Sequence, residues 1–76
     1  MLSEIDIRDY EPKPEQNLYD VKRDTLIKLE DQWYFFKHID GMYSLVYEML
    51  EQGNNLVAGN ISHIKAWAVV VPWVKK

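Results

Sequence analysis

The chain lacks several of the residues on which common protein chemistry depends. It has 76 residues and no cysteine, which excludes disulfides and thiolate metal sites. Its two histidines, His38 and His63, are far apart in the sequence and show no metal-ligand spacing. Only three glycines occur, each isolated, so no loop is rich enough in glycine to cradle a phosphate. We therefore expect a protein that is not an enzyme and that binds neither a metal ion nor another cofactor.

Long apolar runs are also missing. No stretch approaches the roughly 20 apolar residues that cross a bilayer, and residues 1–9 are too acidic for a secretory signal. The sequence thus predicts a soluble, cytoplasmic protein with no membrane partner. A chain of this length forms one small core, so its stability depends on aromatic burial or on self-association, for example as a homodimer.

Charge is distributed unevenly along the chain. Residues 1–20 contain six acids and two bases, a net charge of −4, whereas residues 21–76 contain six acids and seven bases. We interpret 1–20 as an acidic N-terminal arm and 21–76 as a small β-rich domain. Four acids of the arm are candidates for contact with a partner: Glu4, Asp6, Asp9 and Glu11. Prolines 12 and 14 favour an extended path, so the arm is either a mobile terminus or a strand that pairs with a sheet edge, of this chain or of a partner.

What the chain does contain is a run of four aromatic residues, Trp33 to Phe36. Successive side chains of a strand point to opposite faces, so this run places two rings on each side. One small core covers only one of those sides. The other pair of rings needs a second layer or a partner, which indicates binding more than chemistry.

A β-meander of about five strands accounts for the apolar pattern. The expected strands are 25–29, 32–38, 42–50, 56–58 and 64–71, with a bend at 59–60 and with Pro72 either ending the last strand or marking a sheet edge. Small antiparallel barrels of the SH3-like type resemble this arrangement in size and rhythm. The fold class is therefore mainly β, a meander or an SH3-like barrel. The main alternative is a short helix over 43–52, because Val46 and Met49 also fit a 3.6-residue period and Gly53 sits where a helix would end.

Two short turns set the predicted register. Glu30-Asp31 is a tight connection that places Ile27 opposite Tyr34. Asp40-Gly41 is a typical two-residue hairpin turn, and it places Phe35 opposite Val46.

This register gives the sheet two unlike faces. One face, which includes Tyr34, Phe36 and Tyr43, is almost wholly apolar and is the predicted core. The other face mixes apolar and charged side chains and is the candidate partner-binding patch: Trp33, Phe35, Val46, Leu26, Lys28, Lys37 and Glu48. Aromatic anchors inside a charged rim are typical of interface centres. The alternative is that the arm, or the C-terminal strand with Trp67 and Trp73, covers this face as a second core layer.

These features favour a non-enzymatic module that binds another protein and regulates or inhibits a larger enzyme. Compact viral proteins that disable host enzymes are similar in size, and an acidic arm suits the displacement of nucleic acid from a basic groove. The alternative is a small barrel that stacks single-stranded nucleic acid on Trp33 and Phe35. The acidic arm and the lack of a basic stripe make nucleic acid the less favoured partner.

Overall fold

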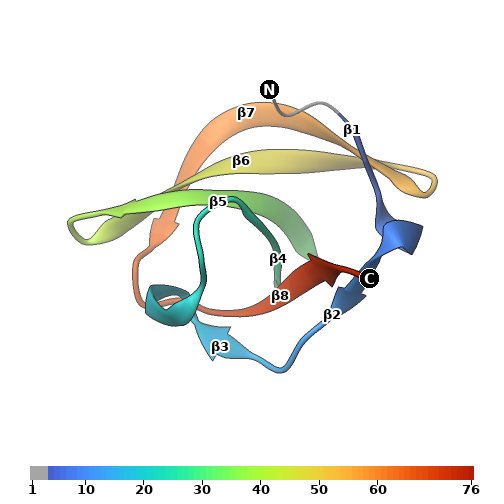
Figure 1. The fold of residues 1–76 in the computed structure, drawn as a ribbon. Helices are drawn as coiled ribbons and strands as arrows, with labels where there is room; N and C mark the ends of the chain where they lie inside the picture. The colour runs from blue at the N-terminus through green and yellow to red at the C-terminus, as the bar shows by residue number, and fades with distance from the viewer. Residues whose placement is uncertain (1–3) are drawn as a thin grey trace.

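The computed structural model describes residues 4–76, so the first three residues of the predicted 1–20 arm lie outside the described part. The protein is mainly β, as predicted, and consists of a curled antiparallel sheet that forms a half-barrel (Figure 1). Its strands are β1 (Glu4–Asp6), β2 (Tyr10–Pro12), β3 (Gln16–Asn17), β4 (Thr25–Leu29), β5 (Gln32–Asp40), β6 (Tyr43–Gln52), β7 (Asn55–Lys65) and β8 (Val69–Lys75). Two single-turn 3-10 helices, η1 (Ile7–Asp9) and η2 (Leu18–Asp20), interrupt the arm.

The strand order is β1-β7-β6-β5-β4-β8-β2, and β3 also pairs with β8. Strands β4, β5 and β6 correspond to the first three expected strands, β7 and β8 replace the last two with different bounds, and β1 to β3 belong to the arm. The segment 43–52 is strand β6, which excludes the helical alternative. Hydrophobic spacing alone could not separate the two possibilities, because a strand buried on both faces has no strict alternation.

The β4–β5 hairpin follows the predicted register. Ile27 lies opposite Tyr34, and Lys28 lies opposite Trp33. Both turn residues, Glu30 and Asp31, have positive φ values of 49° and 67°. Positive φ at both central positions is the geometry of a type I′ turn, whose twist matches that of the flanking strands.

The β5–β6 register was predicted wrongly. Asp40 lies opposite Tyr43, so the turn residues are Gly41 and Met42 and not Asp40 and Gly41. Gly41 has a φ of +65° and Met42 does not have a positive φ. This is the pattern of a type II′ turn, in which glycine occupies the first central position.

A β-bulge between Phe36 and His38 then shifts the pairing again. As a result Phe35 lies opposite Tyr47, and Val46 lies opposite Phe36. The predicted pair of Phe35 and Val46 is therefore wrong, and Val46 projects from the other face of the sheet.

Strand β7 is longer than expected, and the last strand begins later. The bend expected at 59–60 is a bulge inside β7, opposite Glu48. A Cβ on Gly59 would come within 3.2 Å of the Glu48 carbonyl oxygen, which explains glycine at this close approach.

The chain then turns at 66–68, so the predicted single strand 64–71 is wrong. Pro72 does not end β8 but lies buried within it, opposite Ile27.

The sheet has a hydrophobic core on each face because two parts of the arm cover both faces. Helix η2 supplies Leu18 to one face. This η2-side core consists of Leu18, Val21, Ile27, Phe36, Val46 and Val70. Strand β1 supplies Ile5 to the other face. That arm-side core consists of Ile5, Leu26, Trp33, Met49 and Leu56.

The arm bridges the two ends of the strand order. Strand β1 pairs with β7, and β2 pairs with β8. Only η1 separates β1 from β2, so residues 4–12 connect one sheet edge to the other, as Figure 1 shows at the right of the view. The N–H of Ile7 donates to the Asn54 carbonyl, and the N–H of Lys76 donates to the Asp9 carbonyl. The arm therefore pairs with the edges of the chain's own sheet.

Candidate functional site at the apolar end

The predicted partner-binding patch does not form an exposed surface. Trp33 is only 6% exposed, and Leu26 is almost completely buried. The indole N–H of Trp33 donates to Glu51 Oε1 at 3.1 Å, and its ring meets that of Trp73 edge to face with centroids 5.0 Å apart. The premise that these rings are exposed is wrong, because Ile5 of the arm covers them together with Trp73. The second core layer, left open as the alternative, is the arrangement observed.

The remaining patch residues are divided between the two faces. Val46 is fully buried in the η2-side core, and Glu48 lies opposite Tyr34, on the face away from Trp33. Lys28 and Lys37 lie over aromatic rings, with the Lys28 Nζ 4.7 Å from the Trp33 centroid. The misassigned register accounts for the grouping of Val46 and Glu48 with Trp33. A base-stacking platform on Trp33 would also need an exposed ring face, which this burial removes.

Phe35 and Leu26 line a hollow of about 250 Å³ on the arm-side face, together with Tyr10 and Trp73. Its aromatic walls make it a natural first candidate for a site. The Trp73 Nε1 has no hydrogen-bond partner, but the atom is buried from solvent. Asp24, Thr25 and Lys75 also line the hollow. Within residues 4–76, Asp24 pairs with Lys37 and forms no ion pair with Lys75, so the hollow does not define a ligand site.

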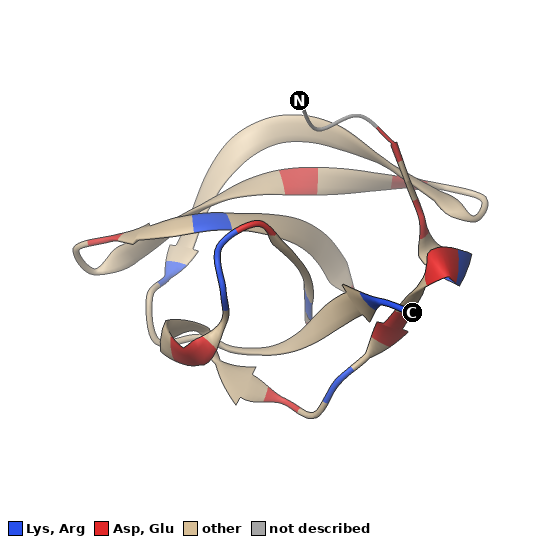
Figure 2. Ribbon diagram, viewed as in Figure 1, with Lys and Arg blue, Asp and Glu red and all other residues tan. Residues whose placement is uncertain are grey.

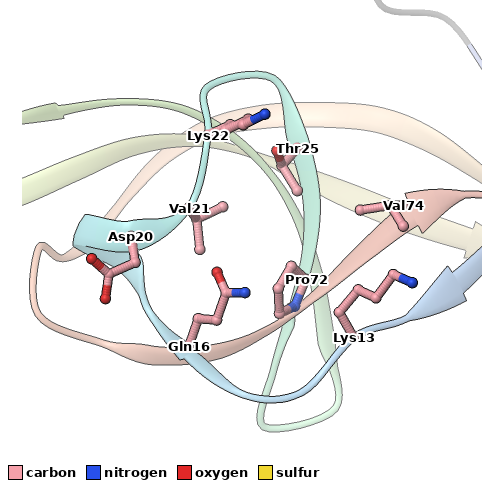
Figure 3. Close-up of a pocket in the computed structure, with 8 residues that line it drawn as sticks. All are labelled: Lys13, Gln16, Asp20, Val21, Lys22, Thr25, Pro72 and Val74. Atoms are coloured by element: carbon pink, nitrogen blue, oxygen red, sulfur yellow. The ribbon is translucent and has the colours of Figure 1, made fainter.

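A second hollow of about 250 Å³ lies on the opposite face, between the arm and strands β4 and β8. Figure 3 shows Gln16 pointing into it, whereas Asp20 points outward at the rim and Lys13 and Lys22 stand on different sides. Lys13 also donates to Glu11 at 3.1 Å. The charged groups do not converge on one point, so this geometry does not define an anion or metal site.

The large hydrophobic side chains that are exposed gather at one end of the molecule. Seven such residues are exposed among those described, and five of them lie around the turn 66–68: Tyr19, Met42, Tyr43, Trp67 and Val69. We call these five residues the apolar end. Tyr43 was predicted to be in the core but is 55% exposed, and Trp67 is 45% exposed. Tyr, Trp and Met are the residue types enriched in interface centres.

Backbone pairing brings the apolar end together from four parts of the chain. The N–H of Ala66 donates to the Met42 carbonyl at 3.0 Å, which holds the β5–β6 turn against the 66–68 turn. Tyr43 lies opposite Lys65 on β7. These contacts place Met42 and Tyr43 beside Trp67.

The arm supplies the other side of the apolar end. The N–H of Leu18 donates to the Ala68 carbonyl, and the Asn17 side-chain amide donates to the Trp67 carbonyl. Asn17 also lies opposite Val69 and caps η2 by accepting from the N–H of Tyr19. Tyr19 therefore reaches the apolar end because η2 is fixed there by hydrogen bonds.

Acidic residues are spread along the arm and also reach the apolar end, where Asp20 lies in η2 and Asp40 lies opposite Tyr43. Figure 2 shows acidic residues along the arm, on β1, η1 and β2, on the path to η2 and on η2 itself, and also near the β5–β6 turn. Asp6 pairs with Arg8 at 2.8 Å. A hydrogen bond from the Arg8 side chain, and a second from its backbone N–H, lower the pKa of the Asp6 carboxyl below its ordinary value. Within residues 4–76, Glu4 and Asp9 form no ion pair. Lys65 stands over the Trp67 ring, its Nζ 6.0 Å from the centroid, and is the cation nearest the apolar end in sequence.

Groups of histidine, aspartate or glutamate that could hold a metal ion are not found among residues 4–76. In the same part of the chain, no helix has the length and apolar character needed to cross a membrane. Comparison of the chain with protein-family models, with curated proteins and with solved structures finds no match.

Sequence reasoning missed the apolar end because its members are scattered. Trp67 was assigned to the interior of a continuous strand, and Tyr43 to the core side of a misregistered hairpin. One usable signal was Gly41-Met42-Tyr43, in which two large apolar residues follow a turn glycine. Hairpin turns usually lie at the surface.

Proposed function

We propose that this protein is a non-enzymatic binding module that contacts another protein through the apolar end. The observation that carries the proposal is the clustering of Tyr19, Met42, Tyr43, Trp67 and Val69 at one end of a sheet whose other large aromatic groups are mostly buried or half-buried. Burial of each such side chain by a partner would contribute on the order of 1.5–3 kcal/mol. A protein this small has a strong reason to bury them in its own core unless a partner covers them.

The acidic arm supports a partner that is basic near its binding surface. Residues 1–20 carry a net charge of −4, and the rest of the chain carries +1. Such an asymmetry orients the module during approach and raises the association rate at low ionic strength. In this proposal the apolar end supplies most of the affinity and the arm supplies the orientation, an arrangement suited to regulating or inhibiting a larger enzyme.

Site-specific photo-crosslinking in the source cells tests this proposal. A benzophenone amino acid replaces Trp67 in one variant and Leu50 in a control variant. Leu50 is also an exposed large hydrophobic residue, but it lies at the other end of β6. We expect a discrete heterologous adduct at position 67 that is lost when Tyr43→Ser is added. Equal adducts from both positions, or none from position 67, would refute the apolar end as the binding surface.

A salt series on the captured partner tests the role of the arm. Replacing Glu4 and Asp9 by Gln and Asn should slow association at low salt and leave dissociation nearly unchanged. The matched control replaces Glu30 by Gln, because Glu30 is an exposed acid in the β4–β5 turn. If both variants associate at the same rate, the arm does not steer binding.

A further inference from the structure

We propose that a second copy of this chain adds an antiparallel strand to the outer edge of β7, which gives a two-fold symmetric dimer. The inference is separate from the proposed function, because it concerns a strand edge and not the apolar end.

The outer edge of β7 is covered over only part of its length. Strand β1 pairs with Asn55 to Val57. Within residues 4–76, no strand pairs with the outer edge from Ala58 to Lys65, although β6 pairs with the inner edge as far as Lys65. Ile61 projects from this stretch and is 57% exposed. An unpaired strand edge presents backbone donors and acceptors that are ready to pair with another strand.

The opposite edge of the sheet is protected. Strands β2 and β3 run along β8, and the N–H of Lys13 donates to the Pro72 carbonyl between them. Pro12 and Pro14 lie in this outer segment, and proline has no N–H to offer to a further strand. Within residues 4–76, the fold therefore blocks one edge with proline and leaves 58–65 of the other edge without a paired strand.

Apart from the bulge at 59–60, the open segment has none of the usual devices against pairing. Residues 58–64 contain neither proline nor any Asp, Glu, Lys or Arg. Edge strands that must stay single usually carry a lysine, a proline or an inward-pointing charge. Because the segment has no such charged residue, two copies of it can approach without repulsion between like charges. This property favours a second copy of the chain over a strand of unrelated charge pattern.

Symmetry restricts the register of such a pair. With a two-fold axis perpendicular to the sheet, directly opposite residues must project from the same face, so within 61–65, beyond the β7 bulge, residue numbers that pair differ by an even number. An axis within 61–63 keeps the partner strand clear of β1 over most of its length. Centred on Ile61, it extends the existing row of Phe35, Tyr47 and Ile61 into its symmetry mate.

The expected dimer is weak. A single strand pair with one apolar row buries less than the roughly 1,200 Å² of a standard interface. Dissociation in the range of about 10 µM to about 1 mM is therefore expected. The two-fold axis closes the assembly, because the β7 edge of each copy pairs with the same edge of the other copy.

Single cysteines provide a direct test because the chain has none of its own. Ile61→Cys, Ser62→Cys and His63→Cys are made separately, with Leu50→Cys as the exposed control at the other end of β6. The residue on the axis meets its own copy at a Cα separation of about 4.5–5.5 Å, within disulfide range. We expect one of the three variants to form a disulfide dimer at least about tenfold faster than Leu50→Cys. Equal rates at all four positions would overturn the proposal.

Sedimentation velocity of the unmodified chain gives an independent readout. Between about 10 µM and about 1 mM the sedimenting mass should rise toward twice 9.1 kDa. Ile61→Lys should keep the native circular dichroism spectrum, since the residue is exposed, and should remain monomeric throughout. A native chain that stays monomeric over this range, or an Ile61→Lys variant that still dimerises, would overturn the proposal.

Discussion

Replacement of Trp33 by alanine is the sharpest test of the two-sided core. Trp33 is 6% exposed, so nearly its whole side chain is removed from water. A buried tryptophan of about 150–250 Å² at about 25 cal/mol per Å² corresponds to roughly 4–6 kcal/mol. Measured Trp→Ala substitutions in cores fall near 3–5 kcal/mol. The substitution also leaves Glu51 without its indole donor and Trp73 without its edge-to-face partner.

We therefore expect Trp33→Ala to lower the free energy of unfolding by about 4 kcal/mol, a large part of the roughly 5–15 kcal/mol that small domains possess. Urea denaturation followed by far-UV circular dichroism measures this change, at one low protein concentration. Trp67→Ala is the matched control and should cost less than about 1 kcal/mol, because Trp67 is 45% exposed. Phe36→Ala, in the η2-side core, should resemble Trp33→Ala. If Trp33→Ala lowers the free energy of unfolding by less than about 1 kcal/mol while Phe36→Ala lowers it by several kcal/mol, the residues of the arm-side core do not stabilise the fold.

Three smaller perturbations test local features. Ser44→Ala should raise the free energy of unfolding by about 1 kcal/mol in urea denaturation, because the Ser44 hydroxyl is buried with no partner in residues 4–76; a loss would show that the hydroxyl is satisfied. The double change Glu30→Asn with Asp31→Gly should stabilise the β4–β5 turn by about 1 kcal/mol, since both residues have positive φ; no gain in melting temperature would contradict the turn geometry. The Asp6 pKa is lowered by Arg8, so its contribution is complete above the ordinary pKa of 3.8 and is lost as pH falls through the folded value. The melting temperature of Asp6→Asn should accordingly be lower than that of the native chain near neutral pH and equal to it in strong acid. If the two melting temperatures still differ in strong acid, the effect of the substitution does not come from ionisation of Asp6.

The parts of the fold that follow from local chemistry could be predicted from the sequence. The β4–β5 turn needs two residues that tolerate positive φ, and Glu30-Asp31 separates two β-rich runs, so its register was predicted correctly. The strands around the 52–55 turn were also found for this reason. Local turn chemistry and short-range alternation together determine such elements.

The parts that depend on bulges could not be predicted. The bulge after Phe36 adds one residue to β5 without any glycine or proline to mark it. The bulge opposite Glu48 does contain Gly59, but its effect on the pairing of β7 depends on the partner strand. Each bulge reverses which face the following residues occupy. Tyr43 was therefore predicted to be inside and is outside, and Val46 was predicted to be on the patch and is in the core.

The position of the apolar end could not be predicted from the sequence for a related reason. Tyr43 and Trp67 are separated by most of β6 and β7, and only the pairing of Tyr43 with Lys65 shows that they are neighbours. The pairing of Asn17 with Val69 likewise brings the arm to this end. Long-range pairing of this kind is not encoded in the spacing of apolar residues along the chain.

The arm explains how a short chain can hold four consecutive aromatic residues. A flat sheet of this size would bury one face and leave the rings of the other in water. Here the arm first lays Ile5 against the Trp33 side, then crosses the edge of β8, and then lays Leu18 against the Phe36 side. Residues 4–20 therefore serve both faces, and the acidic side chains between these two anchors remain on the outside. Because the arm completes both cores at once, the aromatic run is a feature of folding, and the surface available to partners is the one that the arm leaves uncovered.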